Sequence, residues 1–166
     1  MSVPLLSRLL TCLALVITGS AVAGAPTFTE ARPDLYTGGQ PNAAQLREFA
    51  AKGVKVVIDL RRADEDRGYN EAAMVNELGL HYISLPIGGA DDLTPANAAA
   101  LERALGEAHG PMLLHCASGN RVGALLALAA AEQEGLAPQA ALDLGKRAGL
   151  KSLEPAVRER LGLDPR

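Results

Sequence analysis

Apolar and polar positions follow two different spacings along this chain, and the spacings predict strands that alternate with helices. Short apolar runs of the kind found in buried strands lie at 35–37, 54–60, 80–85 and 112–114. Helical spacing, bounded by capping residues or by Gly and Pro, follows at 43–52, 71–78, 95–108, 122–134, 138–148 and 154–161. Residues 26–33 read as an extended lead-in, 63–70 as a charged, solvated loop and 86–92 as a flexible loop.

This alternation predicts a single α/β domain, with a mostly parallel central sheet flanked by helices on both faces. Ligands of such sheets bind at the carboxyl ends of the strands. The loops after Leu60, Leu85 and Leu114 all begin at that edge. We therefore expect one site where these three loops converge, with Arg61 or Arg62 as candidates for its rim.

Composition and net charge argue against several classes of binding partner. Charged residues make up 21% of the 166 residues and the net charge is −3, with no basic stripe, so nucleic acid is an unsuitable partner. Aromatic residues make up 3% and Trp is absent, which argues against platforms for stacking bases or sugars. Three His and two Cys show no metal-ligand spacing, and we expect no metal and no cofactor. The oligomeric state is left open.

The first 23 residues have the pattern of a secretory signal peptide. Arg8 supplies a positive charge, residues 9–17 form a short apolar core, and 20–23 end in Ala-x-Ala. We expect cleavage after Ala23, which leaves a domain over 24–166 in the periplasm or outside the cell, without a stable membrane anchor. An uncleaved anchor is the alternative. Cleavage would leave Cys116 as the one cysteine, a thiol to be considered functional in an oxidising compartment.

The most informative stretch is 112–123, Met-Leu-Leu-His-Cys-Ala-Ser-Gly-Asn-Arg-Val-Gly. A strand, a tight turn and a helix start form an anion cradle, because turn amides and the helix N-terminus point unpaired N–H groups at one spot. Such surroundings lower a thiol pKa, so Cys116 is the candidate nucleophile. Arg121 can offer two parallel N–H donors to an oxyanion. The amides of Ala117, Ser118, Gly119 and Asn120 complete the predicted phosphate-binding set. A buried structural cysteine is the alternative.

His115-Cys116-x4-Arg121 resembles the signature of protein tyrosine and dual-specificity phosphatases. The segments 56–61 (Val-Val-Ile-Asp-Leu-Arg) and 82–86 (Tyr-Ile-Ser-Leu-Pro) are similar to the approach of those enzymes to their active site. The turn 37–41 (Thr-Gly-Gly-Gln-Pro) and the segment 145–150 resemble a compact bacterial phosphatase-like family that also occurs fused to beta-lactamase-like hydrolases. The resemblance implies a dual-specificity-phosphatase-like fold and a phosphomonoester of a protein or small molecule as substrate.

By the same resemblance, Cys116 would form a phosphocysteine, and a general acid would lie in the loop after the third strand. Asp91 and Asp92 are the candidates, with a slight preference for Asp92; His115 would support the loop. Both aspartates could instead only solvate that loop.

Two departures keep other functions open. Four residues separate Cys116 from Arg121 where most tyrosine phosphatases have five, and Val122 stands where they have a hydroxyl. A loop of this size is typical of rhodaneses, so a sulfurtransferase with a persulfide on Cys116 is one alternative. An oxyanion-binding module without turnover is the other.

Overall fold

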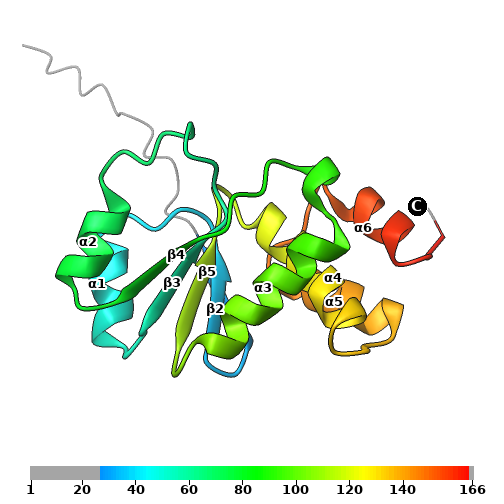
Figure 1. The fold of residues 1–166 in the computed structure, drawn as a ribbon, viewed down its shortest axis with the longest axis horizontal. Helices are drawn as coiled ribbons and strands as arrows, with labels where there is room; N and C mark the ends of the chain where they lie inside the picture. Colours follow the sequence, from blue (N-terminus) through cyan, green and yellow to red (C-terminus); the bar gives the residue numbers. More distant parts are fainter. Residues whose placement is uncertain (1–26, 165–166) are drawn as a thin grey trace, which may run out of the picture.

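The computed structural model describes residues 27–164, and the expected signal peptide lies outside that range. Five strands form one sheet in the order β1-β2-β5-β3-β4 (Figure 1). The strands are β1 (Phe28–Arg32), β2 (Leu35–Gly38), β3 (Val56–Asp59), β4 (His81–Ser84) and β5 (Met112–His115). The helices are α1 (Ala43–Ala51), α2 (Glu71–Glu77), α3 (Pro95–Glu107), α4 (Asn120–Glu132), α5 (Pro138–Arg147) and α6 (Glu154–Arg160), with a short 3-10 turn, η1 (Ala90–Asp92).

The sheet is parallel apart from one edge. Strands β2, β5, β3 and β4 run in the same direction, whereas β1 pairs antiparallel with β2. Residues 26–33 are thus more than an extended lead-in, since most of them form an edge strand. Only Ala31 of this strand is buried, so the sequence carries little strand signal there. The predicted flexible loop before α3 also contains the ordered turn η1.

Helices cover both faces of the sheet, which confirms the predicted fold class (Figure 1). Helices α1 and α2 lie on one face, over a small core that includes Leu46, Val57 and Val75. The other four helices lie on the opposite face, over a larger core that includes Ile58 and Leu125. Burial of apolar surface between the sheet and the helices stabilises this arrangement by about 25 cal/mol for each Å² removed from water.

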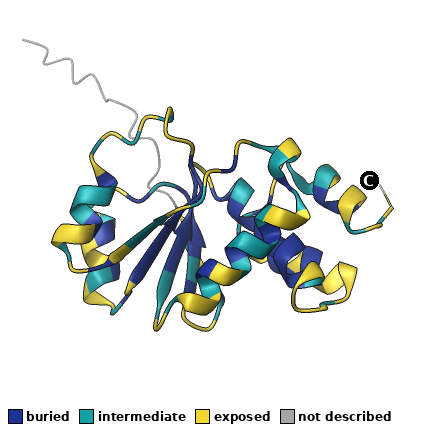
Figure 2. Ribbon diagram, viewed as in Figure 1, coloured by how far each residue is buried: buried dark blue, intermediate teal, exposed yellow. Residues whose placement is uncertain are grey.

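Helix α4 is the centre of the larger core. Every residue from Val122 to Ala130 is buried, because α4 packs between the sheet, α3 and α5 (Figure 2). A Cβ at Gly123 would overlap the backbone of Gly145 and Leu150, so only glycine permits this close crossing of α4 and α5. The first turn of α4 is therefore held rigidly, and the loop that precedes it begins from a fixed point.

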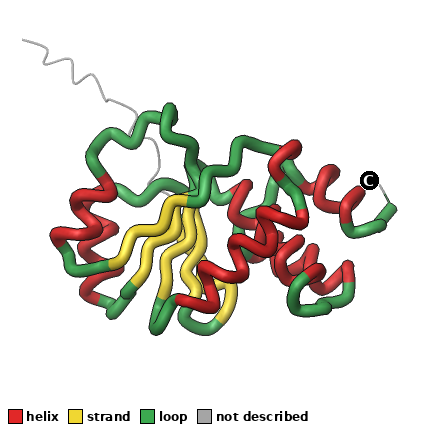
Figure 3. The backbone as a smooth tube through the Cα atoms, in the orientation of Figure 1, coloured by secondary structure: helices red, strands yellow, loops and turns green. Residues whose placement is uncertain are grey.

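The loops that follow β3, β4 and β5 meet at the carboxyl edge of the parallel strands (Figure 3). Within residues 27–164, no helix is both long and apolar enough to cross a membrane. The edge where the loops meet is the place where a doubly covered parallel sheet binds its ligand.

Candidate active site

The loop between β5 and α4 curls around the cysteine. Cys116 is fully buried, and its Sγ accepts a hydrogen bond from the Gly119 amide at 3.1 Å. Gly119 has φ 85°, a left-handed conformation that reverses the chain just before α4 begins. This hydrogen bond fixes the position of the Sγ atom within the loop, and sulfur is the candidate nucleophile.

A second turn, 37–41, forms a wall of this loop. The Cys116 amide donates to the Gly38 carbonyl at 3.3 Å, and the Gln40 amide donates to the Ala117 carbonyl at 3.2 Å. Gly39 and Ser118 form an isolated bridge. The turn after β2 and the loop after β5 therefore fix one another, while the side chains of Ala117 and Ser118 remain exposed.

Arg121 is fixed by Glu65, which belongs to the loop 63–70 that the sequence predicts to be exposed to solvent. Its Nη1 and Nη2 atoms donate to the two carboxylate oxygens of Glu65 at 2.5 and 2.6 Å, and Nη1 also donates to the Ile87 carbonyl at 2.8 Å. The Glu65 carboxylate raises the pKa of Arg121, burial opposes that rise, and the charge of Cys116 adds to it. The bonds to Glu65 and Ile87 occupy one side of the Arg121 guanidinium and fix it beside Cys116.

A cavity of about 390 Å³ opens in front of Arg121 and part of the loop after β5. Its walls are Arg62, Glu65, Gly88, Gly89, Ser118, Asn120, Arg121 and Leu153. Both arginine side chains reach it, so a bound group meets two positive charges together with the amides of a helix start. That combination suits a tetrahedral oxyanion.

Asp92 contacts Gly88, a residue of the cavity wall, and Asp91 makes no such contact within residues 27–164. The Oδ2 atom of Asp92 accepts a hydrogen bond from the Gly88 amide at 2.6 Å, and its carbonyl accepts one from Asn97 at 2.7 Å. Asp92 also acts electrostatically on Arg62, another residue of the cavity wall. Asp91 is exposed, and its carboxylate makes no hydrogen bond or ion pair within residues 27–164.

Asn120 joins the cradle to the C-terminal segment. Its Oδ1 accepts hydrogen bonds from the amides of Lys151 at 2.8 Å and Leu153 at 3.2 Å, and its Nδ2 donates to Ser152 Oγ at 2.8 Å. The group of Asn120 predicted to bind phosphate is its backbone amide, and its side chain is used for this link. Only its backbone N–H remains for a ligand.

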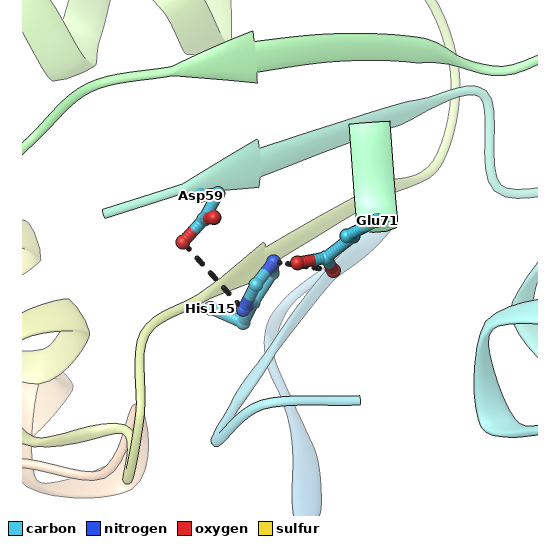
Figure 4. A group of neighbouring side chains, drawn as sticks. All are labelled: Asp59, Glu71 and His115. Atoms are coloured by element: carbon cyan, nitrogen blue, oxygen red, sulfur yellow. Dashed lines mark ion pairs between the residues drawn. The ribbon is translucent and has the colours of Figure 1, made fainter. Parts of the chain in front are cut away.

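A buried charge network lies behind the cradle (Figure 4). His115 is fully buried between two carboxylates: its Nε2 lies 3.0 Å from Glu71 Oε1, and its Nδ1 lies 4.0 Å from Asp59 Oδ1. Neither contact has hydrogen-bond geometry within the described chain. Arg61 pairs with both carboxylates, at 3.0 Å to Asp59 and 2.5 Å to Glu71. His115 thus supports the loop from behind and does not face the cavity.

The same three side chains, Asp59, Glu71 and His115, hold potential metal-ligand atoms within 4.8 Å of one another. They do not fit a cation well. Both Asp59 oxygens already accept hydrogen bonds, from Arg61 and Arg67 among others. A divalent ion would sit against two guanidinium groups and would displace these bonds. We interpret the group as an ion-pair network.

Asp59 should make the fold sensitive to strong acid. Burial raises its pKa, but the hydrogen bonds from Arg61 and Tyr82 and the nearby His115 outweigh burial and bring the pKa from 3.8 to about 2. A lowered folded-state pKa stabilises the protein above the unfolded-state pKa, and this contribution is lost as the pH falls. We expect the free energy of unfolding to drop by about 2 kcal/mol between about pH 4 and pH 2 from this group alone.

Urea unfolding at a series of pH values checks this. Tyr82→Phe removes one of the hydrogen bonds to the Asp59 carboxylate, made at 2.7 Å, so the acid-dependent loss should become smaller. Tyr36→Phe, which changes another partly buried tyrosine away from Asp59, is the matched control. Equal acid-dependent losses in both variants would contradict the role given to Asp59.

Glu65 should act as a positioning residue for Arg121. Glu65→Gln keeps the shape of the side chain but removes the charge that fixes the guanidinium, and we expect turnover of an aryl phosphate to fall about tenfold. Asp64→Asn is the matched control, because Asp64 is adjacent in sequence but pairs with Arg62 in an exposed ion pair. Steady-state rates of both variants compare the two. Equal losses would show that Glu65 acts only through net charge.

The fold and the site together define a cysteine-dependent phosphatase-like domain, with Cys116 on the loop after a parallel strand and Arg121 in the first turn of the helix that follows. The chain belongs to the family described as "Beta-lactamase hydrolase-like protein, phosphatase-like domain", whose profile matches residues 19–133.

Two curated relatives support this family assignment. A beta-lactamase hydrolase-like protein of Xylella fastidiosa is 35% identical over 98 residues, which cover 57% of this chain and 22% of that protein. The dual specificity protein phosphatase TpbA of Pseudomonas aeruginosa is 32% identical over 120 residues, covering 70% of this chain and 52% of TpbA. The chain thus matches about a fifth of the Xylella protein's length and about half of TpbA's.

The fold is also shared with solved structures. The structure of P. aeruginosa TpbA in complex with phosphotyrosine superposes with a TM-score of 0.64 at 22% identity, covering 87% of this chain and 93% of that one. This similarity confirms the predicted dual-specificity-phosphatase-like fold.

Proposed function

We propose that the chain is a metal-independent phosphomonoesterase that works through a phosphocysteine on Cys116. The observation that carries the proposal is the placement of Cys116 Sγ under the Gly119 amide, beside an Arg121 that Glu65 fixes. A tetrahedral dianion placed in the cavity would meet Arg121 and the start of α4 on the cavity wall, and the Cys116 sulfur is buried beside Arg121. This is the arrangement that stabilises charge developing in a phosphoryl transfer.

In the first step the Cys116 thiolate attacks phosphorus, the S–P bond forms and the bond from phosphorus to the leaving oxygen breaks. Asp92, which is hydrogen-bonded to Gly88 of the cavity wall, gives its proton to that oxygen. In the second step water attacks phosphorus, the S–P bond breaks, and Asp92 takes the proton of the water. Arg121 and the loop amides hold the three remaining oxygens throughout. The products are an alcohol or phenol and inorganic phosphate.

Val122 bears on the second step. It is fully buried in the core of α4, so the residue after Arg121 contributes packing and brings no hydroxyl to the sulfur. We therefore expect breakdown of the phosphocysteine to be the slow step, visible as a burst of phenol release before steady turnover.

Asp92→Asn tests the general acid. Loss of a positioned acid typically costs 10²- to 10⁴-fold, so we expect hydrolysis of phenyl phosphate to fall about 10²-fold. The loss should be smaller for p-nitrophenyl phosphate, whose leaving group needs no proton. Asp91→Asn is the control, because Asp91 is exposed on the same turn. Equal losses on both substrates, or a larger loss in Asp91→Asn, would remove Asp92 from this role.

Sulfur transfer is the competing function, because the four-residue loop is typical of rhodaneses. Assays with an aryl phosphate and with thiosulfate plus cyanide, run side by side under reducing conditions, distinguish the two. Phosphate release without thiocyanate supports the phosphatase. Thiocyanate without phosphate release would contradict it.

We further propose that the protein is exported, with cleavage after Ala23, and acts on a phosphorylated protein or small molecule outside the cytoplasm. The signal-peptide pattern of residues 1–23 supports the location. The phosphotyrosine bound to TpbA supports the class of substrate. Mass spectrometry of the N-terminus of the protein recovered from the periplasm tests the cleavage site.

A further inference from the structure

A second cavity lies on the other side of the 150–153 turn from the active site. Its volume is about 420 Å³, close to that of the active-site cavity, and its walls are Lys146, Lys151, Ser152, Glu154, Pro155 and Arg158. The neighbouring residue Leu153 lines the active-site cavity instead. One short turn therefore separates the two cavities.

The second cavity has an excess of positive charge. Lys146 and Arg158 share one carboxylate, Glu154, at 2.9 and 2.8 Å. Their hydrogen bonds lower the pKa of Glu154, so this carboxylate is ionised at neutral pH. The Lys151 ammonium has no ion pair within residues 27–164. Three cations thus face one anion.

The buried side chain of Arg158 has a hydrogen-bond donor without a partner in the described residues, which is an independent sign of a ligand. The residue is only 4% exposed, and its Nη2 atom is buried without a hydrogen-bond partner in the described part of the chain. Its other nitrogens are used, Nε by Glu154 and Nη1 by the Asp164 carbonyl at 3.1 Å. Leaving a charged N–H group buried and unpaired is costly, and a bound anion would remove that cost.

The cavity is connected to the phosphate cradle. The Ser152 hydroxyl on its wall accepts a hydrogen bond from Asn120, and the Asn120 side chain also binds the amides of Lys151 and Leu153. Asn120 directly precedes Arg121. A group bound at Ser152 and Lys151 would therefore lie one side chain away from the cradle.

We propose that this cavity is a second anion-binding subsite, which takes a carboxylate or phosphate group of a substrate whose phosphoryl group occupies the cradle. The proposal rests on the proposed function and narrows it. The preferred substrates are phosphomonoesters that carry a further negative group, and simple aryl phosphates are poor mimics of them.

Two phosphotyrosine peptides test the subsite, one flanked on both sides by Glu and one by Gln at the same positions. We expect kcat/KM to be about tenfold higher for the acidic peptide, because one additional charge-assisted hydrogen bond has an effect of about that size. Lys151→Glu should abolish that preference. Lys55→Glu is the matched control, because it changes net charge equally at an exposed position just before β3, at the opposite edge of the sheet. It should keep the preference.

Equal hydrolysis of the two peptides by the unsubstituted protein, or a preference lost equally in both variants, would overturn the subsite. Binding separates this failure from failure of the proposed function. In Arg121→Ala, sulfate should still shift the backbone amide resonances of Lys151 and Ser152, and Lys151→Glu in that background should remove the shift. If these resonances shift while the unsubstituted protein hydrolyses neither peptide, the subsite stands and the phosphatase proposal fails. If they do not shift, the subsite is wrong.

Discussion

Cys116→Ser should abolish aryl phosphate hydrolysis, with kcat falling by at least about 10⁴-fold. A serine hydroxyl at this position stays protonated at neutral pH and lacks an adjacent base, so no nucleophile remains. The fold should be kept, because serine is nearly isosteric with cysteine. Phosphate release measured with a coupled dye assay gives the rate, and circular dichroism checks the fold.

The same variant should still bind oxyanions, because the Gly119 amide and Arg121 do not depend on sulfur. In the uncleaved chain, Cys12→Ser changes the other cysteine of the sequence; it is the matched control and should retain full activity. Substantial turnover by Cys116→Ser would show that the reaction uses a different nucleophile.

Arg121→Ala should reduce kcat/KM by about 10³-fold. Loss of the guanidinium removes the donors for two phosphate oxygens and also leaves Glu65 unpaired beside the cavity, where its negative charge repels the substrate. Arg121→Lys keeps the charge but cannot make two parallel hydrogen bonds, so it should recover only a small part of the loss. Steady-state kinetics over a range of substrate concentrations separates the effects on kcat and KM.

Arg62→Ala is the control for charge, because Arg62 lines the same cavity but forms an exposed ion pair with Asp64. We expect it to raise KM severalfold with little change in kcat. If Arg62→Ala were as damaging as Arg121→Ala, the cradle would act through its summed charge and not through the placement of one guanidinium.

The sequence predicts the four parallel strands, the helices and the strand–turn–helix order of the cradle, because the signals are local. The apolar runs of β3 and β5 are continuous, and the cysteine, glycine and arginine of the loop stand at short, fixed spacings. Family resemblance adds the turn 37–41, which the structure places against the cradle. Nothing in the sequence of that turn alone indicates that Gly38 and Cys116 are hydrogen-bonded.

Residues from the charged segment 61–71 could not be assigned from the sequence, because their partners are distant along the chain. The sequence predicts that the Glu65 carboxylate is exposed to solvent, yet it binds Arg121, which lies 56 positions further along the chain. Arg61 reads as a candidate for the rim, yet it is 1% exposed and lies between Asp59 and Glu71. Of the candidates for the rim, only Arg62 lines the cavity. Charge patterns alone cannot separate exposed ion pairs from buried ones.

The most direct test of the central claim is mass spectrometry of the protein after brief reaction with an aryl phosphate and quenching in acid. Because Val122 supplies no hydroxyl to assist breakdown, the phosphocysteine should accumulate. We predict that the peptide containing Cys116 gains the mass of one phosphoryl group, and that the gain is absent in Cys116→Ser. Steady phosphate release with no phosphoryl group on that peptide, or a gain of one sulfur atom from thiosulfate instead, would contradict the account.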